Sequence, residues 1–441
     1  MKRFVVAIIA TILLFMAAGS SHATASFPIK ISQDRRIFED ATGKPFLLHG
    51  DTAWSLIAEL KREDVEDYLQ DRRKRGFNAI LVNLVEHQFS RHPPANAYGE
   101  KPFNGEAFVD LNPKYFDHAA WVIERAQQLG FVVLLAPAYL GVSGGDQGWF
   151  RDIEAAGPEK MRLYGQKVAE RFRQYPNIVW VFGGDFNTPD ENLVSSMAEG
   201  IMKISPSSLK TVHPSPETST AEIWGKENWF SFDTLYSYKD VHAGMLKRTA
   251  EDTAMPVILL ETFYEKEWES TPQTIRRNAY GALLAGAAGQ FFGNNPIWHF
   301  SSSGLFAYDG TWPDALNSPG ARSMAIMKAL FGKLPWPQLQ PDRQRRIVVN
   351  PESYGSSLSD GTLSVIYGDA DGFAVQKDVV RQGWQAVWFD PVSGSFADAV
   401  QPEVDASIAI YTPRQSKNAG GGTDWLLLIG SNERLQPIQK R

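Results

Sequence analysis

The stretch Pro256-Val257-Ile258-Leu259-Leu260-Glu261-Thr262 places four consecutive aliphatic residues directly before a carboxylate. A strand that is apolar at every position is typical of a parallel sheet with helices on both faces. Burying an unpaired charge costs on the order of several kcal/mol, so Glu261 needs either a chemical role or a structural partner such as an arginine. The stretch therefore predicts an inner strand that ends at a candidate functional residue.

Similar runs recur on both sides of this stretch, and amphipathic segments separate them. The predicted strands are residues 46–50, 77–83, 131–137, 177–182, 208–213, 231–236, 257–261 and 289–293. The predicted helices are residues 63–75, 113–129, 158–175, 189–203, 241–252, 272–288 and 319–331, and several begin next to a proline. Little helix is visible between the fifth and sixth strands. The alternation predicts an α/β fold, a (β/α)₈ TIM barrel rather than an open doubly wound sheet.

The pattern changes after the last predicted helix, where prolines interrupt the chain. Short strand-like runs separated by turn signals follow, at residues 346–349, 363–367, 373–375, 385–389, 407–411 and 425–429. We expect a barrel domain over residues 26–335 and a small antiparallel β-sandwich over residues 336–441.

The first 25 residues have the order of a secretory signal peptide. A basic start at Lys2 and Arg3 precedes an apolar run, and Ala23-Thr24-Ala25 forms a cleavage-type site. The apolar run is shorter than the roughly 20 residues of a membrane span. We expect an exported protein, periplasmic or secreted, with no membrane contact after cleavage.

Composition narrows the function classes. The chain has no cysteine, which excludes disulfides and thiolate metal sites. A formal charge of −6 without basic blocks argues against a nucleic-acid partner. The 13 tryptophans suit a protein that stacks rings against sugars, although tryptophan also serves simply as a core residue.

Polar residues follow several predicted strands, and in a barrel these strand ends share one mouth. Asp185 comes after the fourth strand, where Gly183 and Gly184 permit a sharp turn. An N-cap role is the alternative for Asp185, but Thr188 before Pro189 is the better cap for the next helix. Asp185 and Glu261 therefore form a candidate catalytic pair.

Two carboxylates facing each other across a barrel mouth suit glycoside hydrolysis. One protonates the leaving oxygen, and the other attacks the anomeric carbon or activates water. By analogy with retaining barrel glycosidases, Asp185 is expected to be the acid/base and Glu261 the nucleophile. The analogy departs at Asp185, because an aspartate reaches less far than the usual glutamate.

Further strand-end residues are expected to bind an oligo- or polysaccharide substrate. The predicted sugar-binding residues are Asp51, Trp54, Asn83, His87, His213, Tyr236, Tyr264 and Trp298. Core packing is the alternative for the aromatic residues, and a buried hydrogen-bonded histidine is the alternative for His213. No cofactor or metal is expected, because no standard zinc, calcium or phosphate-loop spacing is present.

The set of motifs resembles the apiosidase-like family of glycoside hydrolases. It includes Gly50-Asp51-Thr52-Ala53-Trp54, the Gly183-Gly184-Asp185 turn, Thr211-Val212-His213-Pro214 and the strand ending at Glu261. Trp388-Phe389-Asp390-Pro391 and Thr423-Asp424-Trp425 resemble the β-domain that usually follows, which is often labelled collagen-binding. The resemblance implies action on plant cell-wall glycans such as pectic side chains, with an apiosidase as one candidate, and places the catalytic pair on Asp185 and Glu261.

Two other function classes remain open from the sequence. One is a non-catalytic glycan-binding or adhesion protein on a barrel scaffold, and the other is an esterase or amidase. The two opposed carboxylates argue against the first, and the absence of a Gly-x-Ser-x-Gly elbow weakens the second.

Overall fold

The structure is a computed structural model that describes residues 26–250, 255–301, 308, 310–371, 373–405 and 407–440. The predicted signal peptide, residues 1–25, lies outside the described residues. Within the described part, no helix combines the length and the apolar character needed to cross a bilayer.

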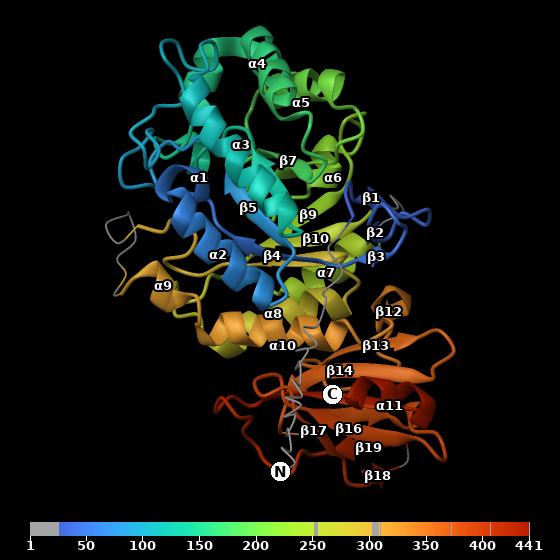
Figure 1. Ribbon diagram of the computed structural model, residues 1–441. Helices are drawn as coiled ribbons and strands as arrows, with labels where there is room; N and C mark the ends of the chain where they lie inside the picture. Colours follow the sequence, from blue (N-terminus) through green and yellow to red (C-terminus); the bar gives the residue numbers. More distant parts are fainter. Residues whose placement is uncertain are drawn as a thin grey trace, which may run out of the picture.

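Eight parallel strands form the centre of the larger part of the molecule (Figure 1). They are β4 (Leu48–Thr52), β5 (Ala79–Asn83), β6 (Val132–Ala136), β7 (Ile178–Gly183), β8 (Lys210–His213), β9 (Asp233–Tyr236), β10 (Val257–Glu261) and β11 (Gly289–Phe292). The order around the sheet is β8-β7-β6-β5-β4-β11-β10-β9. The (β/α)₈ barrel prediction is confirmed.

The barrel closes between β8 and β9. The amide of Ser231 donates to the carbonyl of Lys210 at 2.9 Å. The hydroxyl of Thr211 donates to the carbonyl of Phe232 at 2.6 Å, and that of Thr234 to the carbonyl of Val212 at 2.7 Å. Threonine side chains thus supply part of the bonding between these two strands.

Helices surround the barrel. They are α1 (Leu56–Glu59), α2 (Arg62–Lys74), α3 (Pro113–Gln128), α4 (Phe150–Phe172), α5 (Glu191–Ile204), α6 (Thr220–Trp224), α7 (Val241–Thr249), α8 (Pro272–Leu284), α9 (Trp312–Ala315) and α10 (Pro319–Phe331). Prolines occupy the first turn of α3, α8 and α10, as the sequence predicts. Helix α4 begins eight residues before the predicted start, but Gly157 breaks it with φ 76° and Pro158 begins its second part. The fifth unit has only the short α6.

Side chains fill the barrel interior, and a small sheet covers its floor. The sheet consists of β1 (Lys30–Ile31), β2 (Phe38–Glu39) and β3 (Pro45–Phe46). Phe38 is fully buried and meets Phe232 edge to face with ring centroids 5.0 Å apart. Because the floor is filled, the open end of the barrel is the one at the carboxyl ends of the strands.

The C-terminal part is an antiparallel β-sandwich of two sheets. Its elements are β12 (Leu339–Pro341), β13 (Tyr354–Leu358), β14 (Leu363–Asp369), β15 (Phe373–Gln376), β16 (Gln385–Phe389), β17 (Phe396–Asp398), β18 (Glu403–Asp405), β19 (Ile408–Tyr411), β20 (Asp424–Gly430) and α11 (Asn432–Gln439). The larger sheet has the order β12-β13-β14-β20-β16-β17, and the smaller has β15-β19-β18. The predicted strand at 346–349 is wrong, since that segment makes only an isolated bridge from Val348 to Val375. Five of these strands or helices, namely β12, β13, β17, β18 and α11, were not predicted.

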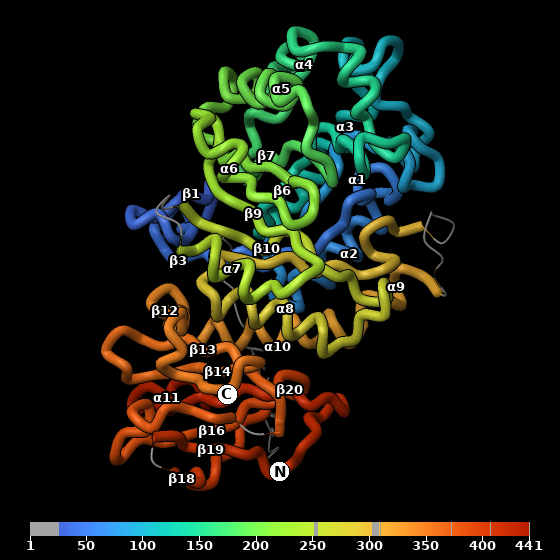
Figure 2. The backbone as a smooth tube through the Cα atoms, turned by 180° about the vertical axis from the view of Figure 1, so that it is seen from behind, coloured from blue at the N-terminus to red at the C-terminus, as the bar shows by residue number. Residues whose placement is uncertain are grey.

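The larger sheet is the middle layer between the barrel and the smaller sheet (Figure 2). One face carries Val365 and Leu428, which belong to the core shared with the barrel helices. The other face carries Ile366 and Leu427, which pack against the smaller sheet. Both faces of β14 and β20 are therefore covered by protein.

A buried ion pair joins this sheet to the barrel. Arg276 of α8 binds Asp424 of β20 through two hydrogen bonds of 2.7 and 2.6 Å. Tyr367 and Asn418 also donate to Asp424, at 2.9 and 2.8 Å. Tyr280 of α8 stacks on Tyr367 with ring centroids 5.2 Å apart. The two parts are thus joined by a specific and dry contact.

Candidate active site

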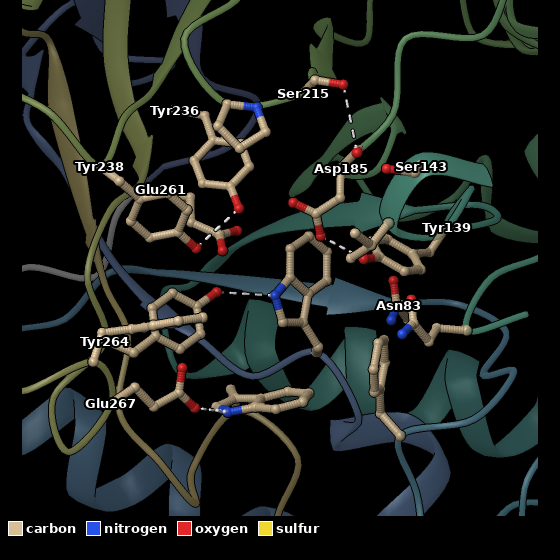
Figure 3. A pocket seen from close by; sticks show the side chains of 17 residues that line it. Asn83, Tyr139, Ser143, Asp185, Ser215, Tyr236, Tyr238, Glu261, Tyr264 and Glu267 are labelled. Atoms are coloured by element: carbon tan, nitrogen blue, oxygen red, sulfur yellow. Dashed lines mark hydrogen bonds between the residues drawn. The ribbon is translucent and has the colours of Figure 1, made fainter. Parts of the chain in front are cut away.

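A pocket of about 460 Å³ opens at the carboxyl ends of the barrel strands (Figure 3). Of its 17 lining residues, eight are aromatic and seven others carry polar or charged side chains. The lining residues are Trp54, Asn83, Phe89, Tyr139, Val142, Ser143, Gln147, Asp185, Ser215, Pro216, Tyr236, Tyr238, Glu261, Tyr264, Glu267, Trp268 and Trp298. A largely apolar pocket with a few converging polar groups is typical of a small-molecule or oligosaccharide site.

Asp185 reaches the pocket through an unusual turn after β7. Gly183, Gly184 and Asp185 all have positive φ, at 84°, 123° and 53°. A Cβ at Gly184 would lie 2.2 Å from the ring of Tyr139, so only glycine fits there. The hydroxyl of Tyr139 donates a hydrogen bond to the Asp185 carboxylate. The turn and Tyr139 together fix the carboxylate in the pocket.

Glu261 reaches the pocket because β10 is irregular at its end. Ile258 and Leu260 point into the barrel interior and Leu259 points outward, so simple alternation would point Glu261 outward as well. The pairing with β9 instead shifts register between Leu259 and Glu261, which is a β-bulge. Bulges often redirect a side chain near an active site. Here the bulge turns Glu261 into the mouth of the barrel.

His213 lies beneath the pocket and joins the backbone of Asp185 to the carboxylate of Glu261. The amide of Asp185 donates to His213 Nδ1 at 3.0 Å, and His213 Nε2 lies 2.7 Å from Glu261 Oε2. Since Nδ1 accepts a hydrogen bond, the ring proton lies on Nε2, which donates a hydrogen bond to Glu261 Oε2. Both carboxylates favour a charged imidazole, but a second proton on Nδ1 would face the Asp185 amide. Burial lowers the pKa of His213, but the hydrogen bond to Glu261 and the charges of Asp185 and Glu261 outweigh it and raise the pKa above its ordinary value.

Three side chains here have donor atoms that a metal could use. One atom each from Asp185, His213 and Glu261 lies within 4.8 Å of the other two. The ring nitrogen nearest Glu261 carries a proton, however, and so has no free lone pair for a cation. The set is better described as a hydrogen-bonded pair of carboxyl groups with a histidine.

Two of the pocket carboxyls have raised pKa values. Burial and the charge of Asp185 raise the pKa of Glu261, and hydrogen bonds from His213 and Tyr264 oppose this effect. Burial raises the pKa of Glu267 to about 7, with a smaller contribution from the charge of Glu261. Perturbed carboxyl groups that share a cleft are characteristic of catalytic and binding sites.

Six more of the predicted residues lie at or beneath this pocket. Trp54, Asn83, Tyr236, Tyr264 and Trp298 line it. The indole of Trp54 donates to the Tyr264 hydroxyl at 3.1 Å, and the Tyr236 and Tyr238 hydroxyls are 3.0 Å apart. His213 is only 1% exposed, so it lies beneath the cavity and supports Glu261.

The other two predicted sugar-binding residues lie away from the pocket, and these predictions are corrected. Asp51 is fully buried on the outer face of β4, where it accepts a hydrogen bond from Tyr68 at 2.8 Å and pairs with Arg72 at 3.4 Å. His87 packs edge to face on Trp149 with ring centroids 4.7 Å apart, and it lies 3.9 Å from Asp152. Neither residue lines the cavity.

Several lining residues were not predicted from the sequence. Tyr139 and Glu267 are two of these, and they hydrogen-bond to Asp185 and Trp298 respectively. Both follow predicted strands by a few residues, at positions beyond the strand ends themselves. The reason that they were not predicted is their place in loops and not their residue type.

Residues 32–338 match the family described as apiosidase-like, catalytic domain. The chain belongs to the apiosidase-like family. Among curated proteins no relative matches it.

Solved structures similar to this apiosidase-like chain are glycoside hydrolases. One is described as a glycoside hydrolase family 5 protein from Bacteroides vulgatus ATCC 8482, with 22% identity, a TM-score of 0.78, and coverage of 92% of this chain and 94% of that one. Another, described as a glycoside hydrolase, has 22% identity, a TM-score of 0.78, and coverage of 92% and 97%. At these identities the likeness establishes the fold, and it extends over both the barrel and the β-sandwich.

Proposed function

We propose that this chain is a retaining glycoside hydrolase of plant cell-wall, pectic-type glycans, with apiosyl groups as the first candidate substrate. The observation that carries the chemistry is the spacing of Asp185 and Glu261, whose oxygens approach within 4.8 Å. This closest approach of two oxygens supports the spacing of about 5–5.5 Å between the carboxyl groups of retaining enzymes over the roughly 6.5–9.5 Å of inverting enzymes, which must admit a water. Family membership supports the glycan class.

Glu261 is the proposed nucleophile. His213 Nε2–H donates to its Oε2, which stabilises the charged form and orients the group. The other oxygen, Oε1, attacks the anomeric carbon and forms a glycosyl-enzyme ester as the glycosidic C–O bond breaks. The carboxyl of Asp185 gives its proton to the departing oxygen in the same step.

Asp185 then acts as the base in the second step. It takes a proton from a water molecule, whose oxygen attacks the anomeric carbon and releases Glu261. The Tyr139 hydroxyl keeps Asp185 in place through both steps.

The test is sugar release from a panel of plant glycans, pectic side chains included, by wild type, Asp185→Ala and Glu261→Ala, with the exposed Glu269→Gln as control. We expect release by wild type and the control, and a loss of at least about 10³-fold in both other variants. Azide should restore turnover in both, giving a glycosyl azide of retained configuration with Asp185→Ala and of inverted configuration with Glu261→Ala. The opposite stereochemistry would reverse the roles, and persistent release in either variant would remove that residue from the mechanism.

The alternative, a non-catalytic glycan-binding protein, has a distinct outcome in the same experiment. It requires that wild type bind glycans in the panel without releasing sugar. It also requires that glycan binding survive substitution of both carboxylates.

A further inference from the structure

A third carboxyl group, that of Glu267, lies in the pocket outside the proposed catalytic pair. Its Oε1 accepts a hydrogen bond from the indole of Trp298 at 2.8 Å (Figure 3). No described residue donates a hydrogen bond to its Oε2. One oxygen is thus anchored, and the other is available to a ligand in the cavity.

The loop that carries Glu267 has a strained backbone. Lys266, Trp268 and Glu269 all have positive φ, at 70°, 51° and 59°, although none is glycine. Hydrogen bonds hold the loop in this shape: Glu267 N donates to the Tyr264 carbonyl at 3.1 Å, and Ser270 N to the Glu267 carbonyl at 2.9 Å. Strain of this kind is concentrated at ligand-contacting loops.

The loop also brings an exposed aromatic ring to the rim. Trp268 lines the pocket and is nevertheless 70% exposed. An indole exposed at the rim of a pocket offers a flat apolar face on which the C–H face of a sugar ring can stack. A sugar ring that stacks on an indole, with hydroxyls directed to a carboxylate, matches both features.

The charges around the cavity restrict what that sugar is. Among the described lining residues are three carboxyl groups, Asp185, Glu261 and Glu267, and no lysine, arginine or histidine. A uronic acid in this pocket would bring a further carboxylate with no cation to meet it.

Resting on the proposed function, we propose that Glu267, anchored by Trp298, forms with Trp268 a binding subsite for an uncharged sugar ring. Its Oε2 accepts hydrogen bonds from the ring hydroxyls. Glu267 is a specificity-determining residue that takes no part in bond cleavage. A galacturonosyl unit of the same glycan is then confined to positions outside the pocket.

The first test uses the panel oligosaccharide that wild type cleaves best. Glu267→Ala should raise KM about 10- to 100-fold, the range expected for losing two hydrogen bonds to a carboxyl group, with kcat within about threefold of wild type. Glu269→Gln, which removes a neighbouring exposed carboxylate from the same loop, should leave both constants unchanged. Unchanged KM in Glu267→Ala would overturn the subsite. A loss of kcat that azide restores would overturn it as well, by making Glu267 catalytic.

The second test measures binding without turnover, by tryptophan fluorescence of Glu261→Gln. Methyl glycosides of neutral pentoses and hexoses should quench the fluorescence, and galacturonic acid at equal concentration should not. If neutral sugars quench the fluorescence, if this quenching is lost when Glu267 is also replaced, and if the wild type releases no sugar from the panel, the subsite stands and the proposed hydrolysis fails. If the wild type releases sugar and its KM does not depend on Glu267, the proposed hydrolysis stands and the subsite fails. Equal binding of galacturonic acid would overturn the restriction to uncharged rings.

Discussion

Glu267 makes stability depend on pH in a direction that follows from its environment. Its pKa is raised by burial to about 7, so between the ordinary value of 4.5 and about 7 the folded chain holds a proton that the unfolded chain has released. Stability should therefore fall as pH rises through this window, by up to about 3 kcal/mol for a shift of this size. Glu267→Gln, which mimics the protonated group, should lose less stability than wild type between pH 5 and pH 8 in denaturant unfolding.

The comparison is made between variants because other buried acids titrate in the same window. Burial raises the pKa of Asp51 to about 6, and that contribution is common to both proteins. Glu269→Gln should follow wild type. Identical pH profiles for Glu267→Gln and wild type would show that Glu267 is solvated rather than held by Trp298.

The alternation of side chains along a strand explains which site residues could be predicted from the sequence and which could not. Asn83 lies two positions after Leu81, whose side chain faces the barrel interior. Because side chains alternate along a strand, the sequence alone places Asn83 on the inner side as well. Asp51 lies three positions after Leu48, whose side chain faces the barrel interior, so the same alternation places Asp51 on the outer face. There it pairs with Arg72. Glu261 departs from this alternation because of a β-bulge, and no pattern in the sequence predicts that bulge.

At the scale of an element, the turn after β7 is the one that the active site depends on most. Gly184→Ala would force a methyl group into the Tyr139 ring and a side chain into a backbone with φ 123°. We expect activity to fall by about 100-fold or more, since displacing a reacting carboxylate by about 1 Å has that effect. The check is kcat on the best panel glycan, with circular dichroism to confirm the fold.

Gly157→Ala is the matched control, because Gly157 also has positive φ but a Cβ added there would meet nothing within 4 Å. It should cost some stability and leave kcat unchanged. Equal kcat in the two variants would mean that the turn does not position Asp185.

Buried strands were easier to predict from the sequence than exposed or very short ones. Barrel strands such as β6 and β10 are apolar runs because the core fills one face and helices cover the other, and all eight barrel strands were located from the sequence. The strands β17 and β18 lie at sheet edges and carry exposed polar residues, so no periodicity marks them. The floor strands β1 to β3 have only two residues each, which is too short for any pattern.

At the scale of the whole molecule, Arg276 and Asp424 determine how the two parts are joined. Asp424→Ala would leave a buried guanidinium without its partner, which costs about 3–5 kcal/mol. We expect the calorimetric melting temperature to fall by about 5 °C or more. Asp117→Ala, which breaks a surface pair with Arg171, should change it very little. An unchanged melting temperature in Asp424→Ala would indicate that the two parts unfold independently.

The sequence could indicate that a β-sandwich follows the barrel, but not how the two meet. Arg276 lies in a helix and Asp424 in a strand, 148 positions apart, and each alone is an ordinary charged residue. Only the folded chain shows that they face each other in a dry contact.

The place of β20 in the larger sheet has a consequence during synthesis. It is the last described strand along the chain, yet it pairs with β14 on one side and β16 on the other. Until this segment has left the ribosome, the larger sheet lacks its central strand and Arg276 has no counter-charge. A chaperone that shields nascent β14 and β16 would act in that interval, and a premature stop codon shortly before residue 424 would leave a complete barrel beside a sheet split in two.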